Sequence, residues 1–149
     1  MRLVGTLGRT VIAFAAAVVA TYLLAAVFYT QQVIAKQSAF AVYTTAQQID
    51  TFVQNLAGLW LYGAMIAVAL ALAFAIAAVL KRILKPLAPV AYPMAGAAAM
   101  AVMITLIEQM LGGGAGVIGG ARDAVGLSLQ CLAGFFGGLV FAVLRPSRD

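Results

Sequence analysis

Four long runs of apolar residues, separated by short polar connections, make up most of this chain. They cover residues 10–29, 57–80, 87–111 and 124–144, and each run carries almost no charge. A helix rises about 1.5 Å per residue, so about 20 apolar residues cross the ~30 Å hydrocarbon core of a bilayer. The pattern predicts an all-α, polytopic membrane protein: a four-transmembrane-helix bundle that forms a single membrane domain over residues 1–149.

The first connection, about residues 30–56, has a second pattern of its own. Its apolar residues recur at steps of four and three, which is helical spacing: Val42, Ala46, Ile49, Val53 and Leu56. The residues between them are polar but nearly uncharged, so the pattern predicts an amphipathic helix without a basic face. Such a helix either lies on the bilayer surface by apolar burial or packs on another protein.

Composition excludes the soluble classes. Hydrophobic residues make up 65% of the chain and charged residues only 9%, whereas about a quarter of the residues of a soluble domain are charged. The first connection is also too short to bury a core of its own. Every stable element is therefore expected to belong to the membrane domain.

The positions of the charges matter more than the net charge of +5. Most basic residues lie at the N-terminus, in the second connection or at the C-terminus: Arg2, Arg9, Lys81, Arg82, Lys85, Arg145 and Arg148. The positive-inside rule places these three parts in the cytoplasm (N-in/C-in) and the first and third connections outside, in the periplasm. The cations are then expected to contact lipid headgroups, and no nucleic-acid partner is expected. Aromatic residues flank the outer side of the first two runs, as in an interfacial belt: Tyr29, Tyr43, Trp60 and Tyr62.

Small residues recur every four positions in three of the runs, which places them on one helix face where another backbone can approach closely. The stripes are Ala13, Ala17, Thr21 and Ala25 in the first run, Gly63, Ala67, Ala71 and Ala75 in the second, and Gly134, Gly138 and Ala142 in the fourth. In the third run Pro93 lies about two turns from the start and predicts a bend.

A candidate polar cluster lies toward the outer ends of the third and fourth runs. Its members are Thr105, Glu108, Gln109, Arg122, Asp123 and Gln130. An ionisable residue in a span is a functional candidate by default, and Glu108 is the one acidic residue within the runs. Asp123 is placed to cap the fourth helix, and Arg122 to pair with Glu108. The cluster is either a pocket that opens outward or a set of interfacial groups with interhelical hydrogen bonds.

Reactive residues are scarce. The chain has no histidine and one cysteine, Cys131, which excludes His-ligated haem or metal sites, the commonest general base and an intrachain disulfide. The middle of each run also lacks a charge that a proton relay would use. We therefore expect no enzymatic activity, no cofactor and no metal site.

These features favour a non-catalytic integral protein of the inner membrane, an accessory or assembly subunit of a larger membrane complex. It would act through helix–helix and periplasmic-face contacts, with the lipid bilayer and other membrane subunits, or second copies of itself, as partners. The alternative is a small homo-oligomeric channel or transporter that uses Glu108 and Arg122. Abundant alanine and glycine and the lack of an N-x-[ST] acceptor favour a bacterial source.

Overall fold

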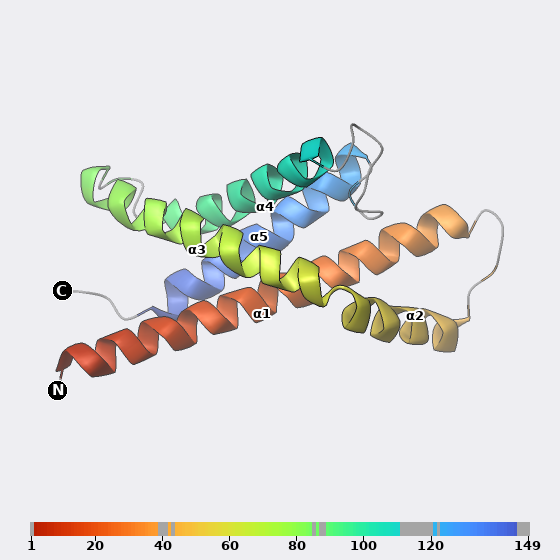
Figure 1. The fold of residues 1–149 in the computed structure, drawn as a ribbon, viewed down its shortest axis with the longest axis horizontal. Coiled ribbons are helices and arrows are strands. Elements are labelled where there is room, and N and C mark those ends of the chain that lie inside the picture. Colours follow the sequence, from red (N-terminus) through yellow and green to blue (C-terminus); the bar gives the residue numbers. More distant parts are fainter. Residues whose placement is uncertain are drawn as a thin grey trace.

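The computed structural model describes residues 2–38, 42, 44–84, 86, 89–110, 121 and 123–145, apart from the side chains of residues 2–5. This part of the chain forms five α-helices: α1 (Arg2–Gln37), α2 (Thr45–Gly58), α3 (Trp60–Ile83), α4 (Ala91–Met110) and α5 (Ala124–Leu144) (Figure 1). All of them except α2 are long and apolar enough to cross a membrane. The prediction of an all-α chain with four candidate spans is confirmed, and the chain fits a multi-pass membrane protein.

Helix α1 is longer than the apolar run that predicted it. The run covers residues 10–29, but the helix begins at Arg2 and continues to Gln37, over 36 residues. The residues after the run include glutamine, alanine and lysine, which are good helix formers, so the change in polarity does not end the helix. At about 1.5 Å per residue, α1 is roughly 54 Å long and extends well beyond a ~30 Å hydrocarbon core.

The predicted bend at Pro93 is wrong, because α4 begins at Ala91 and not at residue 87. Pro93 therefore lies in the first turn, where backbone N–H groups have no partner within the helix and proline removes no helical hydrogen bond. The N–H of Met94 donates to the carbonyl of Val90 at 3.0 Å, so the regular ladder starts directly after the proline.

Helix α5 is the centre of the arrangement, because it packs against both α1 and α4. Helix α3 packs on α4 and makes fewer contacts with α1, and α2 lies against α1. The start of α1, the end of α3, the start of α4 and the end of α5 lie at one end of the molecule, and α2 lies at the other (Figure 1).

Glycines let α5 approach both of its neighbours. A Cβ on Gly134 or Gly138 would overlap the α4 backbone at Gly96 or Tyr92, and a Cβ on Gly137 would meet Thr21 and lie 3.0 Å from the carbonyl oxygen of Ala17 on α1. The backbone of α5 is thus in contact with the backbones of α4 and α1 along two lines, which we call the α4–α5 seam and the α1–α5 seam. Such close approach is common between membrane helices. On α1, the α1–α5 seam is formed by the predicted stripe of small residues. All four members of the stripe are buried: Ala13, Ala17, Thr21 and Ala25. Ala142, at the end of the α5 stripe, is half-buried and packs against the core.

The stripe predicted for α3 is not its packing face. Ala71 and Ala75 are exposed, and α3 instead buries large side chains at the same spacing: Tyr62, Ile66, Leu70 and Phe74. Gly63 does meet α1, since its Cβ would lie 3.2 Å from the Tyr22 ring, and Ala67 is half-buried. In so alanine-rich a helix, small residues fall at four-residue spacing on several faces, and the large side chains decide which face is buried.

An aromatic cluster holds α3 to the other spanning helices. The Phe74 ring stacks on Phe141 of α5 with centroids 4.6 Å apart, and it meets Tyr92 of α4 and Phe14 of α1 edge-on at 5.7 and 6.3 Å. Such ring pairs add about 0.5–1.5 kcal/mol each beyond their buried area. One side chain of α3 thus contacts three helices.

Candidate functional site

Three predicted cluster members lie near the end of α4. The hydroxyl of Thr105 is exposed and donates to the carbonyl of Ala101, one turn earlier, at 2.8 Å. Glu108 is half-buried and Gln109 is exposed. Arg122 lies outside the described residues, and so does its predicted pairing with Glu108. The Thr105 hydroxyl is therefore hydrogen-bonded within its own helix.

Asp123 caps α5, as its position in the sequence predicted. Its Oδ1 accepts a hydrogen bond from the N–H of Gly126 at 2.8 Å, and its Oδ2 lies 3.1 Å from Nζ of Lys36, a partner that was not predicted. The Gly126 N–H, and after it Lys36, lowers the pKa of the Asp123 carboxyl below its usual value of 3.8. Since both side chains are exposed, the ion pair adds little stability, but it connects the end of α1 to the start of α5.

Gln130 belongs to a different contact, inside the bundle. Its side chain is fully buried; Oε1 accepts from the Tyr62 hydroxyl at 3.0 Å, and Nε2 donates to the carbonyl of Ala25 at 3.1 Å. A buried amide is costly unless it is hydrogen-bonded, and here both ends find partners. The contact joins α1, α3 and α5. Tyr62 therefore points into the bundle, although its position near the end of a run had suggested an interfacial role.

The amphipathic helix α2 is attached to α1 by its C-terminal end. The Tyr22 hydroxyl donates to the carbonyl of Leu56, and Nδ2 of Asn55 donates to the hydroxyl of Thr30 at 3.1 Å. The apolar residues Ile49 and Val53 remain 60% and 55% exposed. The apolar face of α2 is thus open to the bilayer surface or to another protein.

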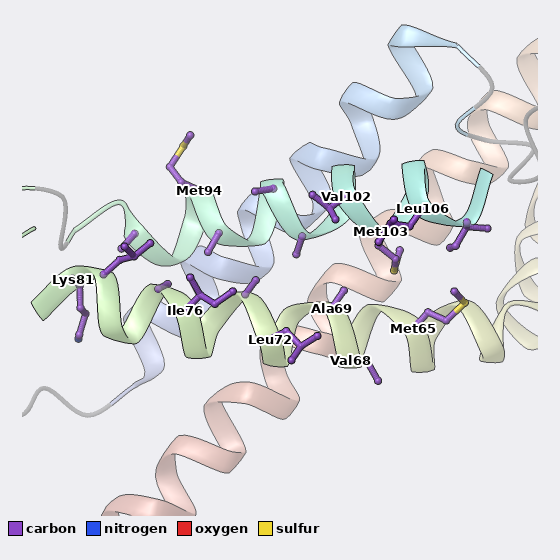
Figure 2. A pocket seen from close by; sticks show the side chains of 18 of the residues that line it. Met65, Val68, Ala69, Leu72, Ile76, Lys81, Met94, Val102, Met103 and Leu106 are labelled. Carbon is purple, nitrogen blue, oxygen red and sulfur yellow. The ribbon is translucent and has the colours of Figure 1, made fainter. Parts of the chain in front are cut away.

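An apolar groove lies between α3 and α4, and we call it the α3–α4 groove. It has a volume of about 990 Å³. It runs along α3 from Ala64 to Leu84, just after the end of that helix, and along α4 from Ala91 to Met110. Figure 2 shows side chains of both helices lining it. Lys81, at one end, is the only charged residue among the described ones that line the groove.

The chemistry of the groove limits what it can hold. Its lining consists of alanine, leucine, isoleucine, valine and methionine side chains apart from Lys81, so it provides contact area and almost no hydrogen bonds. An apolar occupant fits this lining, and an ion or a polar solute does not. Among the described residues, no three Cys, Asp or Glu side chains gather in a way that could hold a metal ion.

No known protein family, no curated protein and no solved structure matches this chain.

Proposed function

We propose that this protein is a non-catalytic accessory or assembly subunit of a larger bacterial inner-membrane complex, and that the α3–α4 groove receives a transmembrane helix of a partner subunit. The observation that supports this most directly is the groove itself, with about 990 Å³ of apolar space along two spanning helices. A partner helix of about 20 residues has the same length as the groove, because both must cross a ~30 Å hydrocarbon core.

The small residues of the groove favour a helix as the occupant. Alanines from both sides line it, including Ala69 and Ala73 of α3 and Ala95 and Ala98 of α4. In a membrane, lipid tails are as apolar as leucine, so helices associate through close packing against small residues and not through the hydrophobic effect. A rigid helix makes more simultaneous contacts with such a surface than a flexible acyl chain does, and it loses less conformational freedom.

The proposed orientation has both termini and the α3–α4 connection in the cytoplasm. Basic residues Lys81, Arg82 and Arg145 are at that end, in agreement with the positive-inside rule. Helix α2 then lies on the periplasmic side, where its exposed Ile49 and Val53 are available to the outer part of the same partner or to the bilayer surface. Gln130, the fully buried member of the predicted polar cluster, cross-links three helices and is therefore not available to a transport pathway.

Photo-crosslinking in cells tests the proposal. A photoreactive amino acid replaces Leu72, which lines the groove and is 64% exposed, or Val19 of α1, which is 55% exposed but lies outside the groove. We expect the Leu72 probe to give a protein adduct whose crosslinked peptide is a transmembrane segment of another protein, and the Val19 probe not to give it. Adducts to lipid alone, or to a second copy of this chain, would overturn the proposal.

A matched pair of substitutions then separates the groove from the rest of α3. Ala73 lines the groove and Ala71, two residues away, is exposed outside it. Ala73→Phe fills the groove and is expected to abolish the Leu72 adduct, whereas Ala71→Phe leaves it intact. Ala95→Leu repeats the test from the α4 side in case Ala73→Phe does not fold, and retention of the adduct in all three variants contradicts groove docking.

A further inference from the structure

Two basic side chains converge on one tyrosine at the end of the molecule where α3 and α5 end and α4 begins. Nζ of Lys81, on α3, lies 5.3 Å from the centroid of the Tyr92 ring, and the guanidinium carbon of Arg145, which follows α5, lies 5.2 Å from the same centroid. Both distances are within the range of cation–π contacts. Three helices thus contribute to this Tyr92 site, which we define as Tyr92, Lys81 and Arg145.

The hydrogen-bonding capacity of Tyr92 is not satisfied by the described residues. Tyr92 is 3% exposed, and its buried hydroxyl has no hydrogen-bond partner within the described part of the chain. A buried hydroxyl without a partner costs free energy, and tyrosine hydroxyls at such positions usually find one. The site therefore combines two positive charges near the Tyr92 ring with a hydroxyl that no described residue engages.

The location of the site determines which anions reach it. Ile83 and Val143, near the ends of α3 and α5, are 72% and 73% exposed and apolar, so the Tyr92 site lies where the apolar surface of the bundle meets its basic end. Anions at a membrane surface are mainly lipid phosphates, and basic residues next to spanning helices attract them. The first turn of α4, which carries Tyr92, also adds the partial positive charge of a helix N-terminus.

We propose that the Tyr92 site binds the headgroup phosphate of an anionic phospholipid. Lys81 and Arg145 contact the phosphate oxygens, the Tyr92 hydroxyl donates to one of them, and the acyl chains lie along the exposed apolar surface near Ile83 and Val143. The cations also complement the C-terminal ends of α3 and α5, but that role leaves the Tyr92 hydroxyl without an acceptor, whereas a phosphate supplies one. The site shares Lys81 with the end of the α3–α4 groove, but it requires no particular occupant of the rest of the groove.

Native mass spectrometry of the purified full chain in detergent, titrated with phosphatidylglycerol or phosphatidylcholine, tests the site. We expect the wild type to prefer phosphatidylglycerol by about fivefold or more, since charge-assisted hydrogen bonds to phosphate are among the strong ones. Lys81→Gln and Arg145→Gln should each weaken phosphatidylglycerol binding about tenfold, and Tyr92→Phe about threefold. Arg82→Gln removes a charge from the neighbouring position of the same helix and should change it less than about twofold.

Several results would overturn the proposal. Equal weakening by Arg82→Gln would show general attraction to the basic end, and equal affinity for both lipids would show apolar binding without headgroup recognition. An unchanged affinity in Tyr92→Phe, which keeps the ring and both cation–π contacts, would remove the tyrosine from the site. Displacement of the lipid by excess inorganic phosphate would assign the site to a free anion. Near-ultraviolet circular dichroism of each variant verifies that the aromatic cluster remains folded.

Discussion

The glycine seam between α4 and α5 leads to the sharpest test of the fold. A Cβ added to Gly96 would overlap the carbonyl oxygen of Gly134 and lie 2.9 Å from its carbonyl carbon and 3.3 Å from the nitrogen of Gly138. All three atoms belong to backbone, so no rotamer change relieves the overlap. In Gly96→Ala the two helices must separate by about 1 Å to reach ordinary van der Waals distance.

The magnitude follows from two opposing effects. Overpacking of a close contact typically costs about 1–3 kcal/mol, whereas replacing glycine by alanine within a helix gains up to about 1 kcal/mol. We expect Gly96→Ala to lower the free energy of unfolding by about 1–2 kcal/mol, the difference between these two effects. Gly8→Ala is the matched control, because Gly8 lies in helix α1 with nothing within 4 Å of the added Cβ. It should be neutral or stabilising by up to about 1 kcal/mol.

The assay is unfolding by SDS in mixed micelles, followed by the near-ultraviolet circular dichroism of the aromatic cluster around Phe74, which contacts α1, α4 and α5. Gly96→Ala should unfold at a lower SDS fraction than the wild type, and Gly8→Ala should not. If Gly96→Ala is as stable as Gly8→Ala, then α4 and α5 do not meet backbone to backbone at this position, and the account of the seam is wrong.

Three further predictions concern polar contacts. Gln130→Leu should lower the unfolding free energy by about 1 kcal/mol in the SDS assay, and its combination with Tyr62→Phe should cost less than the sum of the two changes, because the pair is in contact. The pKa of the Asp123 carboxyl is lowered in the folded protein, so the carboxylate contributes stability that is lost as the pH falls below about 4. Asparagine also caps helices but does not titrate, so the melting temperature of Asp123→Asn should fall less over this pH range than that of the wild type. Thr44→Ala removes the capping box of α2 and should accelerate amide hydrogen exchange in α2 but not in α3. Thr45→Ala, at the adjacent exposed position, leaves the capping box in place and should not accelerate exchange in α2.

Hydropathy predicted the spanning helices well, because length and apolarity are properties of each segment alone. It predicted their ends less well: α1 continues to Gln37 and α4 begins only at Ala91. The ends depend on helix propensity and on local proline geometry, which an apolar run does not record. The amphipathic spacing in the first connection did predict a helix, and α2 is found at Thr45–Gly58.

The polar cluster could be predicted only in part. The capping role of Asp123 is local, since its acceptor and donor are three residues apart, and the sequence showed it. The partners of Gln130 are 68 and 105 residues away, and no local pattern gives such pairings. Gly96 was missed as well, although it is the only glycine of α4, and an isolated glycine in a spanning helix is a signal of close approach.

The distribution of small residues explains both the seams and the groove. The glycines of α5 face the backbones of α1 and α4 on two sides of the helix. Both helices therefore approach α5 closely, and little space remains between them and α5. Helix α3 has Gly63 near its start, but along its buried face it carries Ile66, Leu70 and Phe74, which hold its backbone away from the other helices. The side of α3 next to α4 carries alanines that are too short to fill the resulting space, and the α3–α4 groove is the consequence. An alanine that faces the backbone of a neighbouring helix lets the two helices come into contact, whereas alanines beside large side chains leave a groove between the helices.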